Sequence, residues 1–208
     1  GLGTRLAALA GILTYLSGLA THFPTLLLSS EYLAGFFGIL VVGPGQPSAD
    51  LLLRRLMLTD GTIMSRFRDV TTVSDLLSRL GIEKSAAPLL IRVFLGLNFA
   101  YLGVTEKWLD PGRALQVVEK YDLTAVAPIS PEMWVFGAGL GELAVGLLIL
   151  SGTFTRSAAG AGFLILTTTL FGLPDDPVLA HVTLFGLTSA LLITGSGPFA
   201  LDRTVVPA

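Results

Sequence analysis

The sequence contains no cysteine and little charge. The absence of cysteine excludes disulfides, thiolate metal ligands and a dithiol redox cycle run by the chain itself. Charged residues make up 13% of the 208 residues, whereas about a quarter is usual in a soluble domain. The net charge of −2 is too small to indicate nucleic-acid binding. Hydrophobic residues reach 52% and the mean hydropathy is +0.75, so the composition predicts an integral membrane protein with several spans.

The long apolar stretches predict an all-α, polytopic transmembrane helix bundle with about six membrane helices. A helix needs about 20 mostly apolar residues to cross the hydrocarbon core. The sequence offers six such stretches, roughly at 5–21, 25–43, 87–105, 132–151, 156–173 and 177–195. We expect the inner membrane of a prokaryote as the location.

The stretch 46–86 is different, because it carries many charges of both signs. Its cations are Arg54, Arg55, Arg66, Arg68, Arg79 and Lys84. Within it, "TTVSDLLSRLGIEK" (71–84) has the pattern of a short capped amphipathic helix that ends on Gly81. The positive-inside rule places this stretch and the C-terminus in the cytoplasm, because the other side collects only Lys107, Arg113 and Lys120.

Two parts of the sequence resemble each other at a nearly constant offset. "GLGTRLAALAG" (1–11) aligns with "GTFTRSAAGAG" (152–162), and "GPGQPSAD" (43–50) aligns with "GSGPFALD" (195–202). Similarity at a fixed offset indicates duplicated units. We therefore expect 87–208 to be a complete four-helix unit and 1–50 to be the second half of a first unit, joined by a cytoplasmic linker at 51–86. The first two helices of that first unit are expected to lie outside this sequence.

Three segments resemble the DoxX/DoxD-like membrane family. They are "RVFLGLNFAYLGVTEK" (92–107), "GELAVGLLILSGTFTR" (141–156) and "GSGPFALDR" (195–203). The resemblance covers about 87–205, and 1–55 as half of a second copy. It implies a four-helix module, and the founding members of the family are subunits of a thiosulfate:quinone oxidoreductase. Many other members have no settled activity, so the resemblance bears more on fold than on function.

Ionisable side chains inside a membrane are costly and are functional candidates by default. Glu142 lies midway along a predicted span, with the small residues Ala138, Gly139 and Gly146 on the same face. It is either a proton-transferring or quinone-binding carboxyl, or a hydrogen-bonded acid that holds helices together. Asn98 lies at a similar depth on the preceding span, and we expect it to be the hydrogen-bond partner of Glu142.

Arg92 shares one helix face with Gly96, Phe99 and Gly103, which turns it toward the bundle. It either holds an anion or snorkels to the interface. Glu31 gives the first unit a buried acid of its own and is a further candidate for binding a cofactor.

His22 and His181, the only histidines, are candidates for contacting a haem or quinone, but their spacing predicts no metal site. The outer segment 110–132 offers Arg113, Lys120 and Tyr121, either as a cationic lid or as a surface helix.

Two function hypotheses follow from these observations. In the first, the chain is an accessory or scaffold subunit of a larger, redox-linked membrane complex, with other membrane subunits and lipid as its partners. In the second, it is the membrane subunit of a quinone-linked oxidoreductase, in which an intramembrane carboxyl handles protons and quinone is the candidate cofactor.

Overall fold

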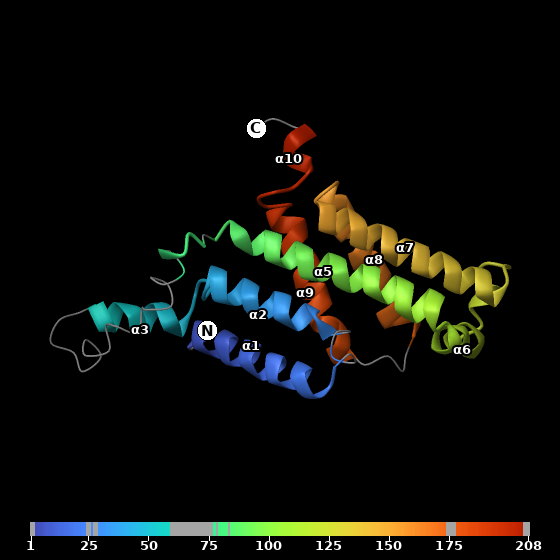
Figure 1. Cartoon of the computed structure of the whole chain (residues 1–208), viewed down its shortest axis with the longest axis horizontal. Helices are drawn as coiled ribbons and strands as arrows, with labels where there is room; N and C mark the ends of the chain where they lie inside the picture. The colour runs from blue at the N-terminus through green and yellow to red at the C-terminus, as the bar shows by residue number, and fades with distance from the viewer. Residues whose placement is uncertain are drawn as a thin grey trace.

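The computed structural model is all-helical over the residues that it describes (Figure 1). These are residues 3–23, 26, 29–58, 77, 79–82, 84–173 and 178–205. The long helices are α1 (Thr4–Thr21), α2 (Glu31–Val42), α5 (Ala86–Val104), α7 (Pro131–Ser151), α8 (Thr155–Gly172) and α9 (Val178–Thr194). The shorter ones are α3 (Ala49–Leu58), the π-helical turn η3 (Thr105–Leu109), α6 (Gly112–Lys120), the 3₁₀ turn η4 (Leu123–Ala125) and α10 (Asp202–Val205).

Five of the six predicted spans coincide with long helices to within two residues at each end. The exception is the span predicted at 25–43, because its helix α2 begins only at Glu31. Helix α3 was not predicted, and its start at Ala49 crosses the expected boundary between the first unit and the linker. Asp50 near its start and Arg55 near its end favour this helix electrostatically.

The amphipathic helix predicted at 71–84 lies mostly outside the described residues, but its predicted end is visible. Gly81 has a left-handed φ of +69°, and the Ile82 N–H donates to the Leu77 carbonyl at 2.9 Å. This six-to-one bond is typical of a helix that ends on a glycine.

Two helices among the described residues are long and apolar enough to cross a bilayer. One runs from Ala86 to Leu109, through α5 and the π-helical turn, and the other is α7. Helix α2 and residues His181–Thr194 of α9 are apolar but shorter. The number of membrane helices therefore stays a prediction.

Helix α5 lies at the centre of the bundle and packs against α7, α2 and α9 (Figure 1). Its contact with α7 is close because glycines face each other across it. A Cβ on Gly146 would come within 2.5 Å of the Ala100 nitrogen, and one on Gly103 within 2.6 Å of the Gly139 carbonyl oxygen. The predicted close approach of another helix at Gly139 and Gly146 is thus confirmed, and it is the arrangement by which small residues join membrane helices.

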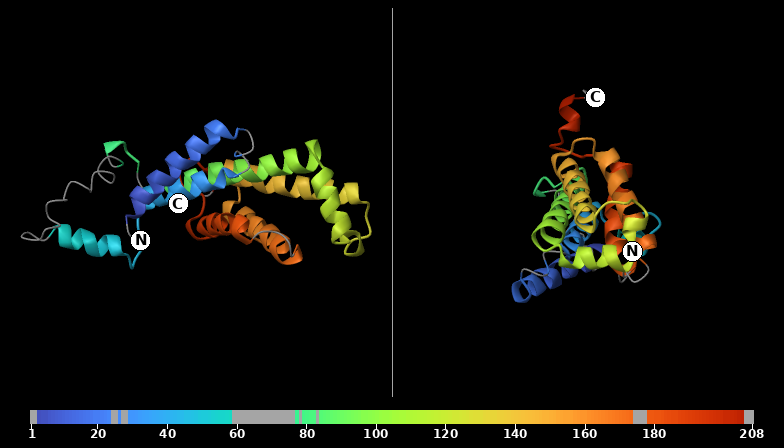
Figure 2. Two further views of the ribbon diagram at one scale, coloured as in Figure 1. Left: turned by 90° about the horizontal axis from the view of Figure 1, so that it is seen from below. Right: turned by 90° about the vertical axis from the view of Figure 1, so that its right-hand side faces the viewer.

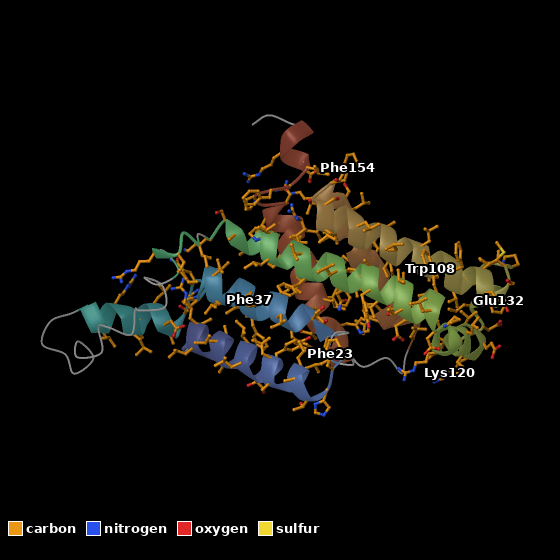
Figure 3. All side chains as sticks on the ribbon, viewed as in Figure 1. Phe23, Phe37, Trp108, Lys120, Glu132 and Phe154 are labelled. Atoms are coloured by element: carbon orange, nitrogen blue, oxygen red, sulfur yellow. The ribbon has the colours of Figure 1, made fainter. Side chains whose placement is uncertain are left out.

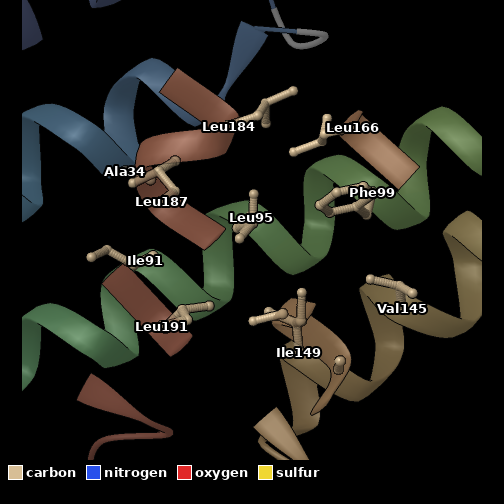
Figure 4. Close-up of a cluster of buried hydrophobic side chains, with 12 residues drawn as sticks. Ala34, Ile91, Leu95, Phe99, Val145, Ile149, Leu166, Leu184, Leu187 and Leu191 are labelled. Carbon is tan, nitrogen blue, oxygen red and sulfur yellow. The ribbon is translucent and has the colours of Figure 1, made fainter. Parts of the chain in front are cut away.

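The main hydrophobic core joins α5 to α7, α8 and α9, with Ala34 contributed by α2 (Figure 4). A second core joins α1 to α2 through Ala8, Ile12, Tyr15, Leu33 and Leu40. Helix α6 runs across the far end of α5 and α7 rather than along them (Figure 2). Val118 of α6 is buried against the bundle while Arg113 and Lys120 of the same helix are exposed. Segment 110–132 therefore contains a helix on the surface of the bundle, one of its expected forms.

Candidate functional site

The most deeply buried polar pair among the described residues joins α2 to α5. Asn98 Nδ2 donates a hydrogen bond to a Glu31 carboxylate oxygen at 3.0 Å. The exposed fractions are only 5% for Glu31 and 2% for Asn98. An acid this deeply buried needs such a partner, because desolvation of an unpaired carboxylate costs several kcal/mol, on the order of 3 or more.

The two residues of this pair lie at the same depth in the bundle. Glu31 is eleven residues from the last residue of α2, Val42, and Asn98 is twelve residues from the first residue of α5, Ala86. At about 1.5 Å per residue, both lie roughly 17 Å from the end of the bundle where these helices meet the connecting segments. In a hydrocarbon core of about 30 Å, this depth is near the middle.

This geometry corrects the expectation that Asn98 is the partner of Glu142. Asn98 bonds to Glu31, whereas the Glu142 carboxylate lies 3.5 Å from Lys107 Nζ. The Glu142 side chain lies beside Gly103. A Cβ added to that glycine would be 3.2 Å from the Glu142 Cβ. Glu31 and Glu142 therefore meet this part of the chain at different levels, one at Asn98 and the other beside Gly103 and Lys107.

The π-helical turn at the end of α5 places Lys107 toward Glu142. In this turn the Asp110 N–H donates to the Thr105 carbonyl at 2.9 Å, one residue beyond the usual α-helical partner. The turn also aims Trp108 at α7, where its ring stacks on Phe136 with centroids 5.4 Å apart (Figure 3). Sequence reasoning counted Lys107 only as an outer cation, and the helical spacing of α5 gave no signal for the inserted residue.

Arg92 is buried to 2% exposure and points into the bundle, as its helix face predicted. Its guanidinium donates to the carbonyl oxygens of Ser196 at 3.0 Å, Pro198 at 3.4 Å and Phe199 at 3.0 Å. Because these acceptors belong to the loop after α9, the arginine fixes this loop to the start of α5. The anion-holding role stays an untested prediction.

The remaining candidates lie at the end of α1, in α9 and on α6. His22 is exposed after the end of α1, where its Nδ1 lies 2.7 Å from the Thr21 hydroxyl. His181 is half-buried in α9. Arg113 and Lys120 are exposed on α6, and Lys120 lies over the Tyr121 ring. In the described part of the chain, no three histidine or carboxylate side chains gather as metal ligands would.

A carboxylate caps the start of α8 from a distant part of the chain. The Asp202 oxygens accept the N–H groups of Phe154 at 2.7 Å and Thr155 at 3.0 Å, together with the Thr155 hydroxyl at 2.9 Å. Partial burial raises the pKa of Asp202, but these hydrogen bonds and the charge of Arg92 outweigh it and hold the pKa below its usual range. In the first turn of the same helix, Arg156 donates to the Ile193 carbonyl at 3.2 Å. We call the Asp202 cap and this arginine contact together the second clasp.

The same arrangement recurs at the start of α1, as the first clasp. The Asp50 oxygens accept the N–H groups of Gly3 and Thr4, the latter at 2.9 Å. Arg5 donates to the carbonyls of Leu40 at 3.0 Å and Val41 at 3.3 Å. Apart from the bond to Leu40, each of these contacts has a counterpart in the second clasp at the residue that the repeat, continued at the same offset, pairs with it.

Comparison with known proteins bears on the second part of the chain. No curated protein and no solved structure matches the sequence. The family model DoxX matches residues 87–181, which run from the start of α5 into α9. This agrees with the resemblance carried by the segments 92–107 and 141–156. The DoxX family is membrane-associated, in keeping with the two helices long enough to span a bilayer. Residues 87–181 are therefore similar to the DoxX family.

Proposed function

We propose that this chain is an accessory integral membrane subunit that joins other helices in a larger, redox-linked complex. The observation that carries this proposal is an exposed stripe of small residues on α1, formed by Ala7, Ala10 and Thr14. We call it the α1 stripe. Small residues allow close packing of helices in membranes, so such a stripe suits a neighbouring helix.

The counterpart of the α1 stripe on α8 already has such a neighbour. The repeat pairs Ala7, Ala10 and Thr14 with Ala158, Ala161 and Ile165. Ala158 is only 3% exposed, and the other two pack against the core that α5 and α7 help to form. On this proposal, a helix pair of the α5–α7 kind covers the α1 stripe in the native assembly.

The contacts of the ionisable candidates also favour an accessory role. The Glu31 carboxylate bonds to Asn98, the Glu142 carboxylate lies near Lys107, and the Arg92 guanidinium binds three loop carbonyls. Each of these contacts joins two elements of the bundle. Such a set of groups can hold helices together without any turnover.

The proposed topology places the six long helices across a prokaryotic inner membrane. Both clasps then lie near the cytoplasmic surface, with segment 46–86 and the C-terminus on the same side. Helix α6 lies at the outer surface, where its orientation across the bundle suits the plane of the membrane.

Crosslinking in native membranes tests the accessory role. Because the chain has no cysteine, Ala10→Cys introduces a single thiol on the α1 stripe. A short thiol-reactive crosslinker should join this thiol to a membrane polypeptide that mass spectrometry then identifies. Leu164→Cys, on the 65% exposed side of α8, is the matched control and should remain uncrosslinked. If both variants behave alike and the chain purifies alone after mild solubilisation, the proposal is wrong.

The mid-membrane Glu31–Asn98 pair favours a second candidate, the membrane subunit of a quinone-linked oxidoreductase of the thiosulfate:quinone type. A buried carboxyl with one hydrogen-bond donor can exchange a proton with a bound redox group. Glu31→Gln keeps an acceptor for Asn98 and removes the titrating group. Thiosulfate-dependent quinone reduction in membranes should then fall by about a hundredfold or more if Glu31 transfers protons.

Glu142→Gln is the parallel variant for the other buried acid. Loss of activity in one variant and not in the other assigns the proton transfer to that carboxyl. If turnover is unchanged in both variants while the chain remains assembled, neither carboxyl belongs to a redox mechanism.

A further inference from the structure

An apolar groove runs between α2 and α9 on the surface of the bundle. Its volume is about 430 Å³, and Ile91 of α5 contributes to its lining. Its other lining residues include Gly35, Gly38 and Ile39 from α2 and Gly186 from α9. We call it the α2–α9 groove. No residue of the candidate site, neither the Glu31–Asn98 pair nor the Lys107–Glu142 pair, lines it.

The groove owes its depth to its glycines. A Cβ on Gly186 would meet no atom within 4 Å, and one on Gly35 would be 3.7 Å from a Thr183 methyl group. Longer side chains such as Ile39 and Val42 line the groove beside them and are more than two-fifths exposed. The groove therefore has apolar walls and open space over its glycines.

The length of the groove matches one leaflet of a membrane. Its α2 lining runs from Tyr32 to Gly43, which is eleven steps of about 1.5 Å, or roughly 16 Å. Half of a hydrocarbon core of about 30 Å is about 15 Å. This length suits an extended hydrocarbon chain that lies within one leaflet.

A cation lies at the end of the groove near the clasp. The Arg5 guanidinium is within 3.0 to 3.2 Å of the position that a Cβ on Gly43 would take, and Gly43 lines the groove. Two carbonyls of α2 hold Arg5 there, those of Leu40 and Val41. A guanidinium is a favourable partner for a phosphate group.

We propose that the α2–α9 groove binds one acyl chain of an anionic phospholipid, with its phosphate at Arg5. The proposal rests on the membrane insertion given under the proposed function. The lipid comes from the leaflet in which the clasps lie, because the groove begins at the first clasp and ends near mid-membrane. The binding is specific, in contrast to the general contact of lipid with exposed leucines elsewhere on the bundle.

Fluorescence quenching in lipid nanodiscs tests the proposal on the full chain. Ile39→Cys, carrying a bimane fluorophore, reports on the groove, and Leu164→Cys reports on ordinary lipid contact at α8. The quencher is phosphatidylglycerol with a nitroxide on its acyl chain, added in increasing proportion to phosphatidylcholine. Quenching at position 39 should saturate at a low proportion of quencher, whereas quenching at position 164 should rise in proportion to the quencher.

Two pairs of variants separate the tail from the headgroup. Gly186→Leu fills the groove, so quenching at position 39 should no longer saturate and should instead rise in proportion to the quencher. Gly141→Leu is the control, because a Cβ there also meets no atom within 4 Å, and it should leave the saturable quenching at position 39 unchanged. Arg5→Gln should raise the proportion of quencher needed for half-saturation about tenfold, the effect of losing one charged hydrogen bond. Arg156→Gln, in the second clasp, should leave it unchanged.

Three results would overturn the proposal. Proportional quenching at both positions would mean ordinary surrounding lipid. Quenching at position 39 by aqueous iodide would mean a water-filled groove. Protection of position 39 from both quenchers would mean that protein covers it. By contrast, an absence of acyl-chain quenching at position 164 would contradict the membrane insertion itself, and so the proposed function.

Discussion

The hairpins α1–α2 and α8–α9 are closed in the same way but are covered differently. In each, an aspartate after the second helix accepts the first N–H groups of the first helix. In each, an arginine in the first turn donates to carbonyls at the end of the second helix. Helix α7 then packs on α8, where Phe99 of α5 also reaches Gly162, whereas α1 packs mainly on α2.

The backbone conformations of the clasps also correspond. Gly3 and Phe154, which precede the two first helices, have left-handed φ angles of +62° and +49°. Gly43 and Gly195, which follow the two second helices, have φ angles of +79° and +75°. The aspartates replace a local cap residue, because they satisfy helix N–H groups that would otherwise lack partners.

Two differences distinguish the second clasp from the first. Arg92 binds the loop at Ser196 to Phe199, and Thr155 adds a hydroxyl hydrogen bond to Asp202. In the first clasp, the Thr4 hydroxyl also helps to lower the pKa of Asp50, but its geometry falls short of a full hydrogen bond. The clasp is thus a property of each hairpin's own sequence, whereas the added contacts of Arg92 come from α5.

The largest expected effect comes from removing these contacts of Arg92. Arg92→Gln leaves the carbonyls of Ser196, Pro198 and Phe199 short of donors and should lower the free energy of unfolding by about 3 kcal/mol. Arg5→Gln, in the less buried first clasp, should cost only about 1 kcal/mol. Chemical denaturation in detergent micelles, followed by circular dichroism, measures both. Equal losses would show that Arg92 does no more than a clasp arginine.

The second part of the chain also shows how far sequence reasoning reaches. Apolar length predicted the ends of α5, α7 and α8 to within two residues, because these helices are long. The shared face of Arg92 and Gly96 was likewise predictable, because helical spacing alone determines it.

The candidate site was less predictable, because it depends on how helices are rotated against one another. Depth alone made Asn98 a reasonable partner for Glu142, but α5 turns that amide toward α2 and Glu31. The π-helical turn that carries Lys107 to Glu142 adds a residue to the helical period, and no residue type announces it. The pairing of Asp50 with Asp202 was visible in the repeat, but the capping that it performs was not.

Protonation of the clasp aspartates should have the next largest effect. Because the pKa of Asp202 is held below its usual value in the folded chain, its ionised form stabilises the fold above about pH 4, and this stability is lost as the pH falls further. Asp202→Asn should therefore cost about 1 to 2 kcal/mol at pH 7, and this cost should shrink as the pH falls below about 4.

Asp50→Asn is the matched variant in the first clasp. It should cost less than Asp202→Asn at pH 7, because the Thr4 hydroxyl contacts Asp50 with poorer geometry than the Thr155 hydroxyl contacts Asp202. Unfolding of both variants and the unmodified chain from pH 7 to pH 3 gives the comparison. A loss that is the same at both ends of this range would rule out ionised Asp202 as the source of the stability.

The smallest expected effect on the isolated chain belongs to the α1 stripe, and it bears most directly on the difference between the hairpins. Ala158→Leu overfills a site that is 3% exposed and should cost about 1 to 3 kcal/mol. Ala7→Leu, at the paired position, should change the free energy of unfolding by less than about 0.5 kcal/mol, because Ala7 is exposed. In native membranes, however, the added leucine would lie where we expect a neighbouring helix to pack, and copurification of the partner should fall. If Ala7→Leu leaves both the stability and the copurification unchanged, the exposed face of α1 meets only lipid, and the two hairpins differ because the first needs no cover.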